Sequence, residues 1–71
     1  MKVSNGDRVM IRSRYGAIIH DEYVIIALPG ETGVVVDEKE HEVLFDRTGY
    51  RAKVFRDDIM APGVTVTTRP L

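Results

Sequence analysis

Histidine and carboxylate side chains that could hold a metal ion adjoin one another at residues 20–22. His20 is followed directly by Asp21 and Glu22. A metal site needs three or four ligands that converge on one point, and three neighbours on an extended chain cannot all face that point. We therefore expect a polar loop tip here and no metal. His41 lies in a charged stretch, and we expect it to be solvated as well.

A second candidate for chemistry is the carboxylate pair Asp57-Asp58. Paired carboxylates act as acid and base where a cleft separates their pKa values, and so short a chain has little interior in which to build a cleft. We therefore interpret the pair as the cap of a helical turn. The glycine-rich segment 30–33 lacks the lysine and the following helix of a phosphate-binding loop. We expect that the chain is not an enzyme and binds no cofactor.

The composition is that of one small globular domain spanning residues 1–71. Hydrophobic residues make up 44% and charged residues 30%, and the absence of cysteine excludes disulfides and iron–sulfur ligation. Ten basic against eleven acidic residues give a net charge of −1, which removes a general attraction for nucleic acid. Because no apolar run reaches about 18 residues and residues 1–6 lack an apolar signal core, we expect a cytoplasmic protein without membrane contact.

The elements that would position these side chains are short strands separated by turns. Residues 8–12 alternate, which predicts a half-buried strand with Val9 and Ile11 on one side and Arg8, Met10 and Arg12 on the other. Residues 13–22 have no clean period and are interpreted as a long loop. Further strands are predicted from apolar or alternating runs at 23–28, 33–37, 42–46 and 50–55, with an additional edge strand at 64–68.

A Pro-Gly turn separates the second and third of these strands. Pro29 presets φ for the first central turn position, and Gly30 can supply the positive φ of a type II turn. Gly33 permits a tight start to the next strand. One short helical turn is predicted near Asp57-Met60. The pattern predicts an all-β fold, a small five-stranded SH3-like barrel with its core at residues 6–60, because closing the sheet removes exposed strand edges.

The order of four short motifs resembles a known group of SH3-like barrels, the electron-transport accessory group. The motifs are Gly6-Asp7-Arg8-Val9, Gly30-Glu31-Thr32-Gly33-Val34-Val35, Val43-Leu44-Phe45-Asp46 and Phe55-Arg56-Asp57-Asp58-Ile59. The group includes the variable chain of ferredoxin–thioredoxin reductase, subunit IV of photosystem I and the barrel of the nitrile hydratase β subunit. This resemblance implies a non-catalytic accessory module that docks onto or stabilises a larger complex, such as an electron-transfer or redox enzyme.

A second resemblance is to the KOW-type modules of ribosomal and transcription proteins. A Gly-Asp-x-Val strand and a Gly-x-x-Gly-x-Val turn recur in those modules and match residues 6–9 and 30–35. The resemblance implies a nucleic-acid-binding module, but KOW modules are usually strongly basic and this chain is not. A third alternative is a subunit of a small oligomeric enzyme whose site forms at a symmetry axis.

Two surfaces could receive a partner. The apolar residues at 18–19 and 23–26 are more than so small a core needs. They either form core under a folded-back loop or make a docking patch of Ile18, Ile19, Tyr23 and Ile25. Basic side chains that project outward either are solvated or converge into a patch for an acidic partner, namely Arg8, Arg12, Arg51, Lys53 and Arg56. We expect a protein partner or a second copy of the chain, with nucleic acid less favoured.

Overall fold

The computed structural model describes residues 2–62 of the chain. Within this range the chain forms seven antiparallel strands in two sheets and one 3-10 turn. The predicted all-β class and the single short helical turn are therefore confirmed. The additional strand predicted at 64–68 lies outside the described residues.

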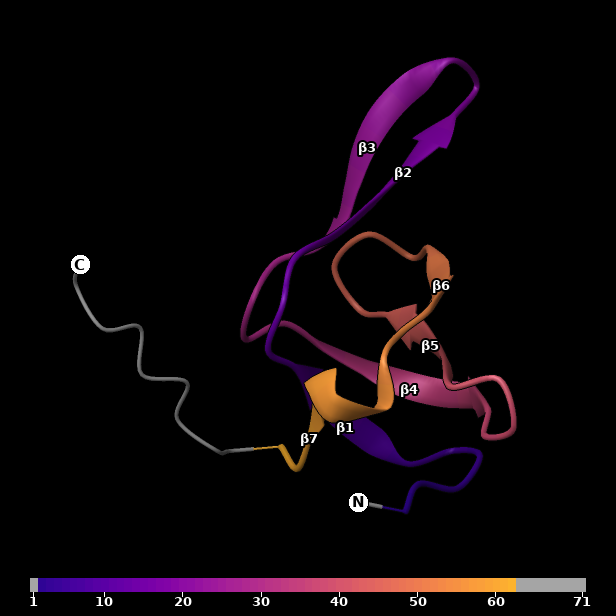
Figure 1. Cartoon of the computed structure of the whole chain (residues 1–71), viewed down its shortest axis with the longest axis vertical. Coiled ribbons are helices and arrows are strands. Elements are labelled where there is room, and N and C mark those ends of the chain that lie inside the picture. Colours follow the sequence, from indigo (N-terminus) through magenta and orange to yellow (C-terminus); the bar gives the residue numbers. More distant parts are fainter. Residues whose placement is uncertain (1, 63–71) are drawn as a thin grey trace, which may run out of the picture.

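Five strands make one sheet, which we call the body (Figure 1). Its spatial order is β6-β5-β4-β1-β7, so three consecutive strands form a meander and the first and last strands lie beside them. The strands are β1 (Arg8–Ile11), β4 (Thr32–Asp37), β5 (Glu42–Phe45), β6 (Arg51–Lys53) and β7 (Ile59–Met60). Among residues 2–62 the outer strands β6 and β7 do not pair with each other, so no closed barrel is detected.

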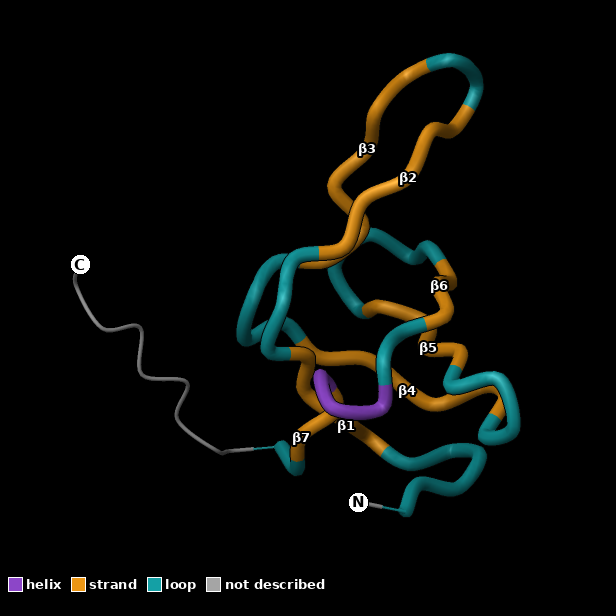
Figure 2. Tube along the Cα trace, in the orientation of Figure 1, coloured by secondary structure: helices purple, strands orange, loops and turns teal. Residues whose placement is uncertain are grey.

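The two remaining strands form a hairpin that projects from the body, which we call the arm (Figures 1 and 2). It consists of β2 (Tyr15–Ile19) and β3 (Glu22–Ala27). The prediction of a loop over residues 13–22 is thus wrong for most of its length. Alternation failed as a signal there because Ile18 and Ile19 are both apolar while Gly16 and Ala17 are both small. The strand is defined by its pairing with β3 rather than by its own pattern.

The core lies inside the body and is closed by the base of the arm. Its buried residues are Val3, Val9, Ile11, Ile26, Ala27, Val35, Val43, Phe45, Val54 and Ile59. The predicted inward sides of β1 and β5 are confirmed by Val9, Ile11 and Phe45, which expose 1% or less of their surface. Met10 was expected on the outer side but is buried, because β7 pairs along β1 and brings Met60 opposite it.

The turn between the arm and β4 has the conformation that its sequence predicts. Gly30 has φ +90°, as the second central residue of a type II turn requires. Gly33 lies between Val9 of β1 and Phe45 of β5, and a Cβ placed on it would come 2.5 Å from the backbone oxygen of Leu44. The glycine is therefore required by the close approach of two strands, more than by the turn that precedes it.

The 3-10 turn η1 (Arg56–Asp58), purple in Figure 2, directly precedes β7. Its Asp58 carbonyl oxygen accepts a hydrogen bond of 3.0 Å from the N–H of Arg12, the residue directly after β1. The residue at its N-cap position is Phe55, and no side chain caps it. The interpretation of Asp57-Asp58 as a helix cap is therefore wrong. A turn of three residues has few free N–H groups to satisfy, which leaves the Asp58 carboxylate available for contacts elsewhere.

Candidate functional site

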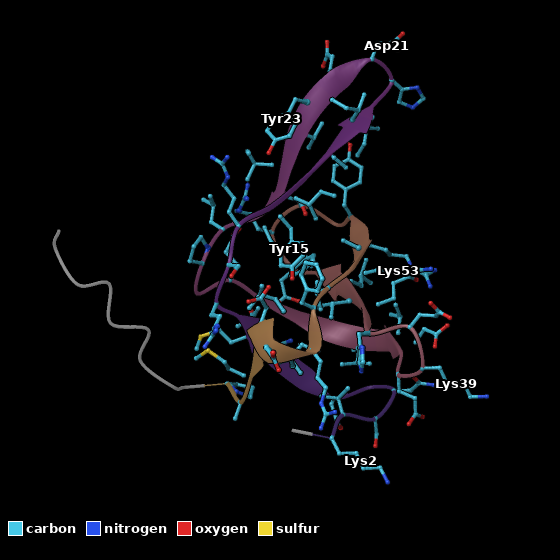
Figure 3. All side chains as sticks on the ribbon, in the orientation of Figure 1. Lys2, Tyr15, Asp21, Tyr23, Lys39 and Lys53 are labelled. Carbon is cyan, nitrogen blue, oxygen red and sulfur yellow. The ribbon has the colours of Figure 1, made fainter. Side chains whose placement is uncertain are left out.

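The arm has an exposed apolar face, which we call the outer face. Antiparallel pairing places Ile18 opposite Tyr23 and Gly16 opposite Ile25, so these four residues share one side of the hairpin. Ile18 is 69% exposed and Tyr23 58% exposed, while Ile25 is half-buried. Figure 3 shows Tyr23 projecting from the side of the arm. Large apolar groups exposed together on a projecting element are typical of a contact surface.

Of the four residues predicted to form an apolar docking patch, the structure brings three together. Ile18, Tyr23 and Ile25 lie on the outer face, and Ile19 lies on the opposite side, paired with Glu22. The difference follows from the strand geometry, since successive side chains of a strand point to opposite faces. The alternative that this run is core holds only for its end, where Ile26 and Ala27 expose 4% and 0%.

The tip of the arm is a two-residue turn formed by His20 and Asp21. Both have positive φ, at 50° and 65°, which is the pattern of a type I′ hairpin turn. Both side chains are exposed, and Asp21 lies at the far end of the molecule in Figure 3, so the predicted polar tip is confirmed. Within residues 2–62 no three His, Cys, Asp or Glu side chains are placed to hold a metal ion.

The base of the arm is fixed by a polar cluster around Asp58, which we call the clamp. Ser13 Oγ donates a hydrogen bond to Asp58 Oδ1 at 2.8 Å, and the Tyr15 hydroxyl donates to Asp58 Oδ2 at 2.5 Å. The Phe55 N–H in turn donates to the Tyr15 oxygen at 2.8 Å, and Arg12 forms an ion pair with Asp58 at 3.5 Å. The clamp thus joins the start of the arm to η1, as the position of Tyr15 in Figure 3 illustrates.

The clamp changes the ionisation of its two central groups. Burial raises the pKa of Asp58, but the hydrogen bonds from Tyr15 and Ser13 and the Arg12 charge outweigh it, so the pKa lies below its usual value. Burial, and then the hydrogen bond to Asp58, raises the pKa of the Tyr15 hydroxyl. Asp58 is therefore ionised and Tyr15 protonated at neutral pH, and their polar atoms are occupied by each other rather than directed at a substrate.

Sequence reasoning did not find the clamp. Ser13 and Tyr15 are separated from Asp58 by more than 40 residues, and no local pattern links the two segments. The sequence offered no signal for it, because a carboxylate in a short turn is most simply interpreted as a cap. A further link between arm and body is the Thr48 hydroxyl, which donates to the Ile26 carbonyl oxygen at 2.9 Å.

Most of the predicted basic patch is neutralised by the chain itself. Arg8 pairs with Asp46 at 2.7 Å, Arg51 with Glu42 at 2.5 Å and Lys53 with Glu40 at 3.1 Å, and Arg12 belongs to the clamp. These four side chains lie on or directly after strands β1 and β6, which are separated by two other strands in the sheet. The structure therefore gives each of them its own carboxylate.

The fifth basic residue, Arg56, has no ion pair within the described residues. It lines a shallow cavity of about 340 Å³ together with Lys2, Val3, Glu38 and His41. Lys2 lies at the opposite end of the molecule from the arm in Figure 3. The cavity is thus separate from the outer face.

The one helical element of residues 2–62 is a three-residue turn, so no helix of this part is long enough to cross a membrane. Comparisons with protein-family models, with curated proteins and with solved structures found no match to this chain. The family resemblances therefore stay predictions, and the outer face of the arm is the candidate site that the geometry itself offers.

Proposed function

We propose that the chain is a non-catalytic accessory module that binds a larger protein through the outer face of its arm. The observation that carries this proposal is the exposure of Ile18 and Tyr23 on an element that projects from the body. Fully burying a large apolar side chain is worth roughly 1.5–3 kcal/mol, and a partner surface would recover the part of this that Ile18 and Tyr23 leave in water. A rigid base supports the same role, because the clamp fixes the direction in which the arm points.

The proposal includes an SH3-like fold. The strand order β6-β5-β4-β1-β7, with a long hairpin after the first strand and a 3-10 turn before the last, is the arrangement expected for that barrel. The sequence resemblance to the electron-transport accessory group makes an electron-transfer or redox enzyme the first class of partner to test. The KOW-type alternative is less well supported, because four of the five basic side chains are paired internally.

The test is capture from the native cells with the purified chain as bait. The wild-type chain and two outer-face variants, Ile18→Asp and Tyr23→Ala, are compared with the body variant Phe55→Ala. Phe55 is 76% exposed and so controls for loss of an exposed aromatic side chain outside the arm. We expect a defined protein that the wild type and Phe55→Ala retain and both arm variants lose. Retention that is independent of the arm, or turnover of a substrate by the purified chain, would contradict the proposal.

A further inference from the structure

The arm leaves one edge of each of its strands without a neighbour. In the described residues β2 pairs only with β3, and β3 only with β2. An exposed strand edge is a row of free N–H and C=O groups that another strand can complete. Because a lone two-stranded hairpin is marginal in water, a further strand would also stabilise the arm.

We propose that the free edge of β2 pairs antiparallel with the same edge of a second copy of this chain. The proposal rests on the proposed function, in that both treat the arm as a docking element. The pairing forms a four-stranded sheet of order β3-β2-β2-β3 with a two-fold axis at Ala17. In an antiparallel hairpin closed by Ile19 and Glu22, alternate residues of β2 turn their N–H and C=O outward. These are Gly16 and Ile18, and the axis at Ala17 sets Gly16 of one copy opposite Ile18 of the other.

The charges at the two ends of the arm favour this antiparallel two-fold arrangement. Asp21 and Glu22 lie at the tip, whereas Arg14 lies at the base, is exposed, and has no ion pair within the described residues. The two-fold axis brings each acidic tip beside the basic base of the other copy, since Arg14 then falls opposite His20 and next to Asp21. Each contact occurs twice in the dimer, and like charges are kept apart.

The edge of β3 does not offer the same complementarity. Its base is buried in the body, with Ile26 and Ala27 exposing 4% and 0%. Self-pairing of β3 about Val24 would bring Glu22 and Asp21 opposite Ile26 and Ala27, which carry no charge. The two edges of the arm are thus distinguishable, and β2 is the one that suits a second copy.

The side chains of the outer face also suit this register. The Tyr23 ring lies over Gly16, where a Cβ would come 2.3 Å from the Tyr23 hydroxyl oxygen. Ile18 of the second copy would pack beside this glycine and against the tyrosine, as large side chains do next to small ones across a sheet. The two outer faces then form one continuous apolar surface, so the dimer enlarges the surface that a larger protein contacts.

The first test is sedimentation equilibrium of the purified chain over a range of concentrations, with charge variants. We expect a reversible dimer. Arg14→Glu and Asp21→Arg should each weaken it about tenfold, the effect of losing two exposed ion pairs, and the double variant should regain most of that loss. A chain that stays monomeric up to millimolar concentration, or a double variant weaker than both single variants, would overturn the inference.

The second test uses the absence of cysteine from the chain, which makes an introduced thiol unique. Ala17 and Val24 are paired across the arm and both half-buried, and Ala17 also packs against the core, so Ala17→Cys is compared with Val24→Cys on the neighbouring strand. At the two-fold axis the two Cα atoms of residue 17 would be about 4.5 Å apart, within disulfide range. We expect oxidation to cross-link Ala17→Cys and leave Val24→Cys monomeric. The reverse pattern would overturn the assignment to β2.

The two proposals fail in different ways. A monomer whose capture of a larger protein still depends on Ile18 would overturn the second-copy inference and leave the proposed function standing. A two-fold dimer that captures a larger protein equally well with and without the outer-face substitutions would overturn the proposed function alone.

Discussion

The body and the arm treat their apolar side chains in opposite ways. In the body, Val9, Val35 and Phe45 each expose 1% of their surface. The basic side chains within strands β1 and β6 have carboxylate partners from the same chain. In the arm, Ile18 and Tyr23 are more than half exposed, and no residue from 15 to 27 forms an ion pair within the described part. Apart from Phe55, which is 76% exposed, no large apolar side chain of the described body is more than half exposed, so the exposed apolar side chains that lie together are those of the arm.

The largest expected effect is on the body. Phe45→Ala removes the largest of its fully buried side chains, and such truncations cost about 3–5 kcal/mol. Domains of this size seldom have more than about 3–5 kcal/mol of stability, so we expect the variant to be largely unfolded at 25 °C. Circular dichroism during urea denaturation measures this. The neighbour Leu44, 38% exposed, supplies the control, since Leu44→Ala should cost far less. Equal losses would contradict a core confined to one side of β5.

The next effect concerns the interior of the sheet. Gly33→Ala places a Cβ 2.5 Å from the Leu44 backbone oxygen and 2.6 Å from Val43 Cγ1. The Leu44 oxygen can move away only if the paired strands β4 and β5 shift. We expect a loss of about 1–3 kcal/mol in the free energy of unfolding. Gly6→Ala is a useful comparison because nothing lies within 4 Å of its Cβ, although its φ of +89° adds strain of another kind. A neutral Gly33→Ala would mean that β4 and β5 lie further apart than described.

The strands of the body and strand β3 of the arm were largely predictable from sequence, and strand β2 was not. Alternating residues placed Val9, Ile11, Val43 and Phe45 inside, because a strand with one buried face must alternate. The arm has apolar residues on both faces of β2 and β3, so no period marks its boundaries.

The clamp escaped prediction for a different reason. It depends on contacts between Tyr15 and Asp58, which lie far apart in sequence. Neither a tyrosine nor an aspartate indicates by its type which distant residue it contacts. Ile19 was assigned to the docking patch because sequence alone did not fix the position of the turn, and with it the face of each arm residue.

A third prediction tests the boundary between the two regions. Tyr15→Phe removes the hydroxyl that donates to Asp58 and accepts from Phe55, which should cost about 1–2 kcal/mol. The sharper readout is amide hydrogen exchange, which should rise in the arm more than in the body because the base of the arm is loosened. Tyr23→Phe removes an exposed hydroxyl from the arm and serves as the control. Uniform acceleration of exchange would show that arm and body open as one unit.

The clamp also makes stability depend on pH. The folded-state pKa of Asp58 lies below the unfolded value of about 3.9, so its contribution is complete above that value and is lost as pH falls through the folded pKa. Unfolding free energies measured between about pH 2 and 6 should therefore fall less steeply in Asp58→Asn than in the wild type. Asp46 lies in the body, and hydrogen bonds from Thr32 and then Arg8 lower its pKa. The pH dependence of unfolding of Asp46→Asn is therefore measured for comparison. An identical slope in wild type and Asp58→Asn would contradict the clamp.

The smallest effect belongs to the tip of the arm. Asp21 has φ 65°, a conformation that glycine adopts without the steric cost that a side chain carries there, and X-Gly is the favoured type I′ turn. Asp21→Gly relieves that cost but adds freedom to the unfolded chain, so we expect a net gain of only a few tenths of a kcal/mol. Amide exchange at Ile19 and Glu22, which close the turn, should slow accordingly. Asp21→Ala removes the same carboxylate and keeps the Cβ, so it separates backbone strain from charge. If alanine slowed exchange as much as glycine, repulsion between Asp21 and Glu22, rather than backbone strain, would limit the stability of the arm.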